Sequence, residues 1–357
     1  AWLRRSDDAG DTVDFTIDGK RFVSPGDLDT QAACYKESPD ATIVAGATDV
    51  GLWVTKQHRT LPTVIHIGRV RELGAIQGTD EMLSIGAGVT YSDALPTLAA
   101  MFPDFGEMIR RIGAVQVRNA GTIGGNVANG SPIGDTPPAL IVLGASVVLR
   151  RGDVERRLPV EEFFIDYGKQ DRQPGEFVQA IEIPLPEAPP RLACYKISKR
   201  FDQDISAVCG CFDVGVKDGT VTDARIAFGG MAATPKRAKA VEAALIGNPW
   251  SAETVAAAAA AFAKDFQPIT DMRASADYRL ETAKNLLHRY FAEYEGRLAE
   301  TRLVGRGAEI AGPRLPSAFR LEDAETTPSV DGGVGATRRH DSGHKHVAGE
   351  AVFVDDI

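Results

Sequence analysis

The sequence predicts a mixed α/β protein, of the α+β class, built from three successive units. Three observations lead to this fold class. Strands and helices alternate in a βαβ-like order at the beginning, a β-rich stretch interrupted by helices follows, and a third unit has its strands first and its helices afterwards. With 357 residues the chain is long enough for two or three domains that each bury a core of their own.

The first unit begins with a predicted hairpin. The stretch VDFTIDGKRF, residues 13–22, alternates in polarity and turns at Asp18-Gly19, which is a typical hairpin signal. About twelve polar residues precede it, and we expect residues 1–12 to form a tail. Further along the unit we expect a helix over residues 28–36, a buried strand over 42–45, a helix over 50–56 and a strand in VIHIGRV, residues 64–70.

The second unit covers residues 80–190. Predicted strands in MLSIGAGV, SVVLRR and FVQAIEIPL alternate with predicted helices at residues 91–98 and 103–112. Four prolines, at positions 184, 186, 189 and 190, then mark a boundary.

The third unit has strands in ACYKIS, SAVCGCFDVGV and VTDARIAFGG, followed by helices at residues 235–246, 251–266 and 276–297. Residues 299–345 are rich in Gly, Pro, Thr and charge without sustained periodicity, so we expect a linker there. The last predicted helix carries apolar residues at helical spacing, which predicts a stripe that faces the core: Leu280, Ala283, Leu287, Phe291 and Tyr294.

Composition argues against two broad classes of protein. A formal net charge of −9 is unsuited to general nucleic-acid binding, which needs a basic face. No apolar run approaches the ~20 residues of a membrane span. The chain opens AWLRRSDDAG without an initiator Met and ends within the alternating pattern EAVFVDDI, so we expect a piece of a longer polypeptide.

The four cysteines are Cys34, Cys194, Cys209 and Cys211, and they form no CxxC pair. Their spacing is wrong for zinc or an iron–sulfur cluster, so we expect no metal in this chain. Alternation within VCGCFDVGV places Cys209 and Cys211 on one face of a predicted strand. We interpret them as small buried hydrophobes in a reducing cytoplasm.

Two glycine-bearing segments are the candidate ligand sites. In IVAGATDVG, residues 43–51, Gly46 follows a strand and precedes a helix, so a turn there points several amides and a helix N-terminus at one place. The segment GTIGGNVANGSPIGD, residues 121–135, has five glycines and no Lys, Arg or His, and it offers the same feature on a larger scale. Together the two segments predict two turns whose amides hold the two phosphates of a cofactor. For either segment alone, the alternative is a tight turn that binds no ligand. The second segment adds neutral hydrogen-bonding groups: Thr122, Asn126, Asn129 and Ser131.

Two charged segments leave alternatives open. YKISKRFDQDIS, residues 195–206, is either a solvated loop or a loop ordered at a redox centre. DMRASADYR, residues 271–279, has the spacing of a local surface ion-pair network of Asp271, Arg273 and Arg279.

Two other patterns are not expected to bind a ligand of their own. SIGAGVTYSD fails the GxGxxG fingerprint because position 91 is Tyr, and it predicts a strand, a turn and a helix start near Thr90 or Ser92. His340, His344 and His346 have a metal-like spacing in the tail, but we expect no metal there.

These motifs, in this order and spacing, resemble the FAD domain of the molybdenum hydroxylases, and within that family bacterial xanthine dehydrogenases most of all. The resemblance covers roughly residues 13–298 and rests on IVAGATDVG, IGAVQVRNAGTIGGNVANGSPIGD, YKISKRFDQDIS and DMRASADYR. It implies the FAD-binding fold of the vanillyl-alcohol-oxidase type of flavoprotein. The implied parts are FAD-binding subdomains at residues 13–65 and 66–187 and a C-terminal flavoprotein subdomain at residues 188–298.

The end of the chain carries a second resemblance. HKHVAGEAVFVDDI is similar to the opening of the molybdopterin domain of the same family, which implies that residues 346–357 begin that domain after the linker 299–345.

The resemblance also implies which residues bind FAD. Asp135 would lie on the adenosine side, Val178 against the adenine, Lys196 at the flavin ring or its phosphates, and Ile205 at the dimethylbenzene edge. Arg200 and Asp204 are the candidates that shape a nicotinamide pocket. The backbone residues implied around the pyrophosphate and ribityl chain are Val44, Ala45, Gly46, Ala47, Thr48, Asp49 and Val50 from one subdomain, and Thr122, Gly124, Gly125 and Asn126 from the other. Asn129 is a further expected cofactor-binding residue.

This sequence departs from animal members of the family at two implied site positions. Ile112 stands where they carry a stacking aromatic residue, so the flavin is expected to have one stacking partner fewer. Gln203 stands where they carry an acid, and removal of that negative charge is expected to make flavin reduction easier.

The implied function is electron transfer. Electrons taken from hypoxanthine or xanthine at molybdenum would pass through [2Fe–2S] clusters to FAD, and a hydride would pass from FAD to NAD+. The implied partners are the iron–sulfur and molybdopterin domains of the same enzyme, in a dimeric cytoplasmic holoenzyme without nucleic acid or membrane. The alternatives are the FAD domain of an aldehyde oxidase or of a carbon-monoxide-dehydrogenase-type enzyme, a stand-alone flavin oxidase, and a flavin-free scaffold subunit.

Overall fold

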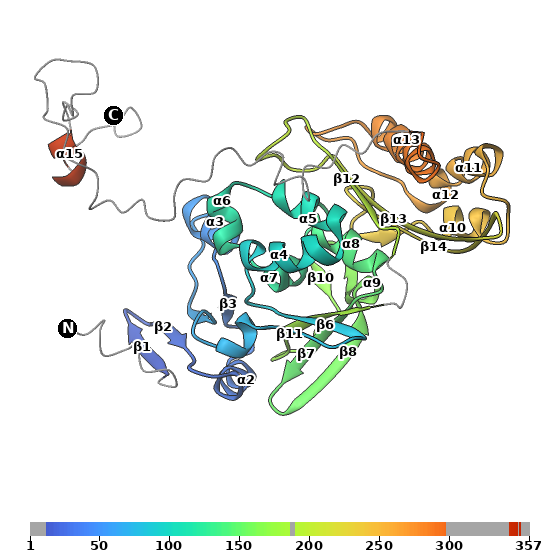
Figure 1. The fold of residues 1–357 in the computed structure, drawn as a ribbon. Coiled ribbons are helices and arrows are strands. Elements are labelled where there is room, and N and C mark those ends of the chain that lie inside the picture. The colour runs from blue at the N-terminus through green and yellow to red at the C-terminus, as the bar shows by residue number, and fades with distance from the viewer. Residues whose placement is uncertain (1–11, 186–189, 298–342, 349, 351–357) are drawn as a thin grey trace, which may run out of the picture. The chain divides into compact units, whose positions relative to one another are not determined.

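A computed structural model describes residues 12–185, 190–297, 343–348 and 350 (Figure 1). The first sheet joins an antiparallel hairpin to two parallel strands. Strands β1 (Val13–Ile17) and β2 (Lys20–Ser24) form the predicted hairpin, and the turn residues Asp18 and Gly19 both have positive φ, as a type I′ turn requires. Strands β4 (Thr63–His66) and β3 (Thr42–Val44) complete the order β1-β2-β4-β3, with helices α2 (Leu28–Glu37) and α3 (Val50–Thr55) in the connections.

The second sheet has five antiparallel strands in the order β5-β6-β11-β7-β8. A run of helices lies between β6 and β7, and α7 packs against β6 and β11 (Figure 1). The strands are β5 (Ile76–Gly78), β6 (Met82–Gly86), β7 (Ser146–Arg151), β8 (Val154–Pro159) and β11 (Phe177–Pro184). The helices are η1 (Arg71–Gly74), α4 (Tyr91–Met101), α5 (Pro103–Arg110), α6 (Val115–Ala120), α7 (Ile123–Asn129), α8 (Thr136–Val142) and α9 (Val160–Phe163), and a small hairpin joins β9 (Phe164–Asp166) to β10 (Lys169–Gln170).

The third sheet is antiparallel in the order β12-β13-β14-β15. Helix α8, from the second unit, packs on β13 and β14. Within the third unit, α13 packs on β13 and α10 packs on β14. The strands are β12 (Ala193–Ile197), β13 (Val208–Lys217), β14 (Thr220–Gly229) and β15 (Lys236–Arg237), and the helices are α10 (Lys239–Leu245), α11 (Ala252–Ala259), α12 (Phe262–Asp265) and α13 (Ala276–Tyr294).

Strand β13 is buried on both faces. Cys209 and Cys211 point into the core of the second sheet and its helices, whereas Phe212 and Val214 point into the core of the third unit. Both cysteines are free and buried, which confirms that they lie on one face as small hydrophobes.

Several sequence-based expectations need correction. The predicted helix over residues 251–266 is two helices, α11 and α12, and the predicted strand over 64–70 ends at His66. Helices α6, α7 and α8 were given no bounds from the sequence; each has only six or seven residues, over which a periodic pattern is weak, although α3, equally short, was expected. The core-facing stripe of α13 is confirmed, since its members are buried or packed on the core of the third unit.

Beyond the third unit, the described residues include one short helix, α15 (Gly343–Ala348), whose first three residues end the expected linker. The expected tail 1–12 and the remainder of the expected linker and molybdopterin-domain start lie almost wholly outside the described residues, as does His340. The division into subdomains stays a prediction. Among the described residues, no helix is both long and apolar enough to cross a membrane.

Candidate functional site

The turn between β3 and α3 leaves a run of backbone amides without partners. Strand β3 ends at Val44 and α3 begins at Val50, so the predicted site residues between them form the turn itself. Ala47 has φ 57°, in the left-handed region that residues other than glycine rarely adopt. Within the described part of the chain, no acceptor bonds the amides of residues 46–50. Consecutive free amides around a left-handed residue make a concave anion site.

The start of α7 supplies a further amide that has no acceptor among the described residues. Thr122 is the N-cap, and its side chain accepts a hydrogen bond of 2.9 Å from the amide of Gly125. The amide of Gly124 bonds no acceptor among the described residues. Gly124 must be glycine because a Cβ there would lie 2.4 Å from Cα of Ala87.

These two turns touch one another. A Cβ on Gly46 would lie 1.6 Å from the carbonyl oxygen of Ala120, and one on Gly121 would lie 3.4 Å from Oγ1 of Thr48. The turn at residues 44–50 therefore packs directly against the segment that leads into α7. The expected proximity of the two glycine segments is found, and it depends on close backbone approach at Gly46.

The expected contribution of helix dipoles is smaller than the sequence suggested. Helices α3 and α7 have six and seven residues, fewer than two full turns each. This place therefore offers an anion the amides of a turn and of two first helical turns, with only a short helix behind each of them.

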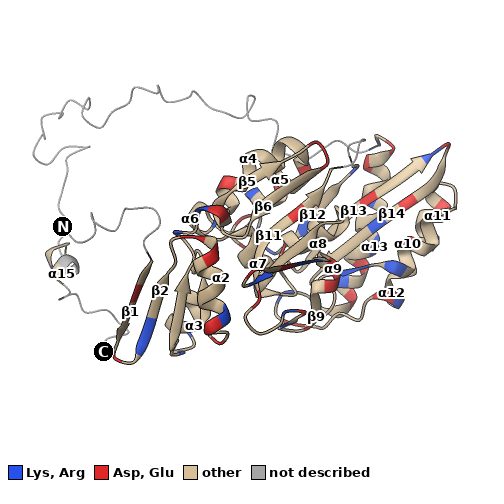
Figure 2. Cartoon of the chain, turned by 90° about the horizontal axis from the view of Figure 1, so that it is seen from below, with Lys and Arg blue, Asp and Glu red and all other residues tan. Residues whose placement is uncertain are grey.

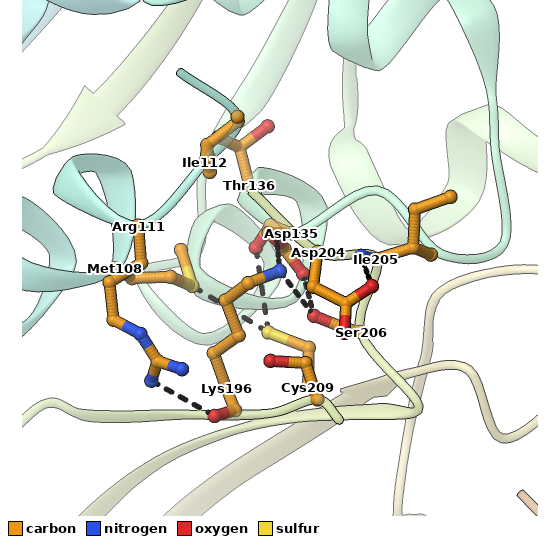
Figure 3. Close-up of polar contacts among 12 residues, drawn as sticks. Met108, Arg111, Ile112, Asp135, Thr136, Lys196, Asp204, Ile205, Ser206 and Cys209 are labelled. Atoms are coloured by element: carbon orange, nitrogen blue, oxygen red, sulfur yellow. Dashed lines mark hydrogen bonds and ion pairs between the residues drawn. The ribbon is translucent and has the colours of Figure 1, made fainter. Parts of the chain in front are cut away.

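A buried ionic network lies at the start of α8 (Figure 3). Asp135 is the N-cap of α8 and Lys196 is in β12; Lys196 Nζ lies 2.6 Å from Asp135 Oδ2. Ser206 closes the network, because its hydroxyl accepts from Lys196 Nζ at 2.8 Å and donates to Asp135 Oδ1 at 2.5 Å. The Lys196 side chain is only 2% exposed. Two predicted site residues, 61 positions apart, thus bond each other.

The ammonium group of Lys196 has one N–H donor without an acceptor among the described residues. An ammonium group has three N–H donors, and Asp135 and Ser206 take two of them. No third acceptor is found among the residues that the structure describes. A buried donor without a partner is costly, so a ligand oxygen at this position would be favoured.

The loop over residues 198–206, which holds Arg200 and Asp204, is ordered by its own contacts. Asp204 accepts from the amides of Arg200 at 2.8 Å and Ile205 at 3.0 Å. These bonds hold the pKa of the Asp204 carboxyl below its usual range. Gln203 adopts a left-handed φ of 54°. Residues 199–203 and 205 are exposed, so the loop is solvated, and its own hydrogen bonds also order it; its place at a redox centre stays a prediction.

Arg111, at the end of α5, ties this loop to the second unit. Its guanidinium donates to the carbonyl of Lys196 at 3.0 Å and to that of Phe201 at 3.2 and 3.3 Å, and it lies 4.4 Å from the centre of the Phe201 ring. The adjacent residue is Ile112, one of the predicted flavin neighbours (Figure 3).

The other predicted site residues are spread more widely. Val178 is buried beside a β-bulge in β11. Asn126 accepts a short hydrogen bond from the hydroxyl of Thr136. Asn129 is exposed at the end of α7, and Ile205 is half exposed.

The expected ion-pair network of Asp271, Arg273 and Arg279 is present, but its Arg279 is buried rather than on the surface. Arg279 is 1% exposed and donates to the carbonyls of Ala207 and Gly230, at 2.5 and 2.7 Å, and to Asp271 at 2.6 Å. Burial alone would raise the pKa of Asp271, but two backbone amides and Arg279 lower it to about 2. Arg273 is the outer partner of Asp271, at 3.2 Å.

Sequence reasoning assigned no role to Ser206 or Arg111. Ser206 had one signal: Lys196 lies in an otherwise apolar strand pattern and needs polar partners when buried. The sequence carried no signal for Arg111, because its hydrogen-bond partners are backbone carbonyls, which every residue has. Among the described residues, no group of His, Cys, Asp and Glu is arranged to hold a metal ion, and Cys194 and Cys211 are too far apart, at 3.5 Å between sulfurs, to be bonded.

The fold and these contacts define a mixed α+β protein with three main sheets and one two-stranded hairpin, and with backbone amides at one place that suit a phosphate-bearing ligand. Residues 15–186 match the family described as FAD binding domain in molybdopterin dehydrogenase, and residues 193–294 match the CO dehydrogenase flavoprotein C-terminal domain.

Characterised proteins with similar sequences include two large enzymes and one enzyme subunit. Nicotinate hydroxylase hnxS of Emericella nidulans is 29% identical over 94% of this chain and 26% of its own length. Xanthine dehydrogenase of Dictyostelium discoideum is 27% identical over 97% of this chain and 29% of its own length. The chain thus spans under a third of those proteins. Glyceraldehyde dehydrogenase medium chain of Sulfolobus acidocaldarius is 31% identical over 64% of this chain and 82% of its own length.

Solved structures of the same kind superpose on this fold. Carbon monoxide dehydrogenase from Hydrogenophaga pseudoflava matches 78% of this chain and 98% of its own, with a TM-score of 0.72 and 29% identity. Quinoline 2-oxidoreductase from Pseudomonas putida 86 matches 77% and 97%, with a TM-score of 0.70 and 25% identity. The chain belongs to the family of FAD-binding domains and subunits of the molybdenum hydroxylases, which confirms both the resemblance and the fold that it implied.

Proposed function

We propose that this chain is the FAD-binding, electron-transfer portion of a xanthine-dehydrogenase-type enzyme. It accepts electrons from [2Fe–2S] clusters and passes a hydride to NAD+. One observation carries the cofactor assignment to these residues: the free amides of residues 46–50 pack against the segment that leads into α7. FAD, when bound, supplies the redox chemistry, namely uptake of two electrons and donation of a hydride to a nicotinamide.

The two turns hold the diphosphate. The amides of residues 46–50 donate from one side and that of Gly124 from the other, and no side chain obstructs them because glycines stand where the backbones meet. Each such bond to a charged group contributes about 1.5–3 kcal/mol. Side chains of the same two segments, including those of Thr48 and Asn129, lie along the path by which the diphosphate would enter.

Lys196 directs its remaining N–H at a cofactor oxygen. Asp135 and Ser206 hold the ammonium in place, and each carboxylate oxygen of Asp135 keeps capacity for a second bond. A positive charge fixed in a buried place favours added negative charge on a neighbouring group. Val178 packs against the adenine, and Ile112 and Ile205 supply apolar contact to the ring system.

The loop of residues 198–206 shapes the place where the acceptor reaches the flavin. Arg200 and Asp204 lie on this loop, and Arg111 fixes it against α5. With FAD bound, no side chain of this loop would be needed as a general acid or base, because the cofactor would supply the hydride chemistry.

The partners are the iron–sulfur and molybdopterin domains of a dimeric, cytoplasmic holoenzyme, with hypoxanthine or xanthine oxidised at molybdenum. Supporting this are the xanthine dehydrogenases among the relatives, of which this chain matches only a little over a quarter, and the relative named a medium chain.

The experiment is a flavin titration. We expect the purified chain to hold one FAD, measured by absorbance and by acid release of the yellow cofactor, and to be reduced by NADH without oxygen. Folded protein that stays colourless and takes up no added FAD would refute the proposal.

A second candidate is the FAD subunit of an aldehyde oxidase or a carbon-monoxide-dehydrogenase-type enzyme. The structural likeness to carbon monoxide dehydrogenase and quinoline 2-oxidoreductase favours it. Retained FAD that dithionite reduces and NADH does not would select this candidate. Rapid peroxide formation by the isolated chain would instead select a flavin oxidase.

A further inference from the structure

Two cysteines face each other across the third sheet. Strands β12 and β13 run side by side and antiparallel (Figure 2), and Cys194 of β12 is directly opposite Cys211 of β13. Their sulfur atoms lie 3.5 Å apart. We propose that Cys194 and Cys211 are a redox-sensitive pair, which hydrogen peroxide oxidises reversibly to a disulfide across the two strands. This inference does not depend on the proposed function.

The backbone at this pair has the spacing that a disulfide needs. The amide of Cys194 donates to Oδ2 of Asp104 at 3.0 Å, and not to Cys211. In β13 the amide of Val214 donates to the hydroxyl of Tyr290 at 3.1 Å, so it points away from β14, whereas the amide of Cys211, three residues earlier, points toward β14. The two cysteines are therefore a non-hydrogen-bonded pair, whose Cα atoms lie about 4.5 Å apart. Disulfides span Cα distances of about 4.4–6.8 Å.

Geometry excludes the other pairings of the four cysteines. Cys209 and Cys211 are two residues apart in one strand, which separates them by about 6.8 Å, whereas the Cβ atoms of a disulfide lie about 3.8 Å apart. The residue opposite Cys209 is Lys196, so Cys209 meets Cys194 only diagonally. Cys34 lies in α2 and packs on a different core. A link between Cys194 and Cys211 is the one that needs no large backbone movement.

The two thiols differ in exposure, which gives them different roles. Cys194 is partly exposed, so a small oxidant can reach its sulfur. Cys211 is 0% exposed, and burial raises the pKa of its thiol. Because peroxide oxidises the thiolate form, Cys194 reacts first, and the adjacent Cys211 is the resolving thiol.

The reaction consumes one hydrogen peroxide and oxidises two thiols. The sulfur of Cys194 attacks a peroxide oxygen, the O–O bond breaks, and water leaves as Cys194 becomes a sulfenic acid. The sulfur of Cys211 then attacks the sulfur of Cys194. The S–S bond forms, the S–O bond breaks, and the proton of Cys211 leaves with the hydroxyl group as a second water. The two electrons that the sulfurs lose reduce the peroxide.

The disulfide closes a covalent ring around part of the candidate site. The chain between the two cysteines contains Lys196, Ser206 and the whole loop of residues 198–206. A cross-link that closes such a ring stabilises the folded chain by restricting the unfolded one. The Cα spacing is at the lower end of the disulfide range, which makes the bond easier to reduce and suits a reversible link.

The test counts free thiols in the full chain before and after treatment with hydrogen peroxide. Folded wild type should lose two of its four thiols, and dithiothreitol should restore both. Peptide mapping by mass spectrometry should find Cys194 linked to Cys211 within one chain. The urea midpoint of the oxidised chain should lie above that of the reduced chain. These measurements on wild type decide the proposal without any variant.

Variants assign the two roles. In Cys211→Ala, peroxide should leave a sulfenic acid at Cys194 that dimedone labels, whereas wild type should give little label because Cys211 resolves it. The controls Cys34→Ala and Cys209→Ala should still form the link. Four intact thiols in peroxide-treated wild type, a link that includes Cys34 or Cys209, a link between chains, or equal dimedone labelling of wild type and Cys211→Ala would each overturn the proposal.

Discussion

Gly46 is the position where a single methyl group should separate the two turns. The Cβ of Gly46→Ala would lie 1.6 Å from the carbonyl oxygen of Ala120, and the carbonyl carbon, at 2.2 Å, is also backbone and cannot rotate away. Carbon and oxygen atoms that are not bonded approach to about 3.3 Å. The turn and the segment before α7 must therefore move apart by about 1.7 Å, the difference between these two distances.

A shift of that size stretches an amide–phosphate hydrogen bond beyond any useful length. If two such bonds are lost, at about 1.5–3 kcal/mol each, FAD affinity falls by about 3–6 kcal/mol. This corresponds to a dissociation constant raised about 10² to 10⁴-fold. The strain itself should lower the free energy of unfolding by about 1–3 kcal/mol, which leaves the chain folded.

The assay is quenching of FAD fluorescence on titration with cofactor-free protein, with far-UV circular dichroism as the check on folding. Gly51→Ala is the matched control, because a Cβ at Gly51, in α3, meets nothing within 4 Å. It should keep wild-type affinity and be stabilised by up to about 1 kcal/mol, as alanine is the better helix former. Wild-type FAD affinity in folded Gly46→Ala would show that the meeting of the two turns does not matter for the cofactor.

Three further predictions follow from the same contacts. Lys196→Met leaves Asp135 buried without its cation and should lower the free energy of unfolding by about 3–5 kcal/mol, whereas adding Asp135→Asn should recover part of that loss; urea denaturation of the single and double variants measures both. Because the folded pKa of Asp271 is about 2, below its value in an unfolded chain, the stability that its carboxylate contributes is complete above about pH 4 and is lost as the pH falls toward 2. Between about pH 4 and about pH 2, the urea midpoint should fall less steeply with pH in Asp271→Asn than in wild type. Identical pH slopes in the two proteins would count against the role of Arg279 as the partner of Asp271. Gly125→Val should abolish FAD retention while circular dichroism stays close to wild type, and an unchanged flavin content would argue against placing the cofactor at α7.

Much of the fold could be predicted from short stretches of sequence, since their signals are local. The Asp18-Gly19 turn, the helical stripe of α13 and the alternation that puts Cys209 and Cys211 on one face each depend on neighbouring residues alone. The same is true of Thr90, which caps α4 as expected, with its side chain accepting from the amide of Asp93. Local signals fail where elements are short, as in α6 to α8, and at the break between α11 and α12.

For the candidate site, the sequence supplied the residues that we propose bind FAD, but not the contacts among them. Glycine at position 46 is visible in the sequence, but the carbonyl that requires it belongs to Ala120, in another part of the chain. Likewise Lys196 and Asp135 were assigned separately, and folding brings them together with Ser206 into one buried network.

The sequence by itself determined the fold class, the family and the segments that carry the glycines and charges. Only the tertiary structure decided that Arg279 is buried, that Arg273 and Lys199 face a common cavity, and that the amides of residues 46–50 bond no acceptor in the described part of the chain. The physical reason is that burial and charge compensation are properties of neighbours in space, and these neighbours lie many residues apart along the chain.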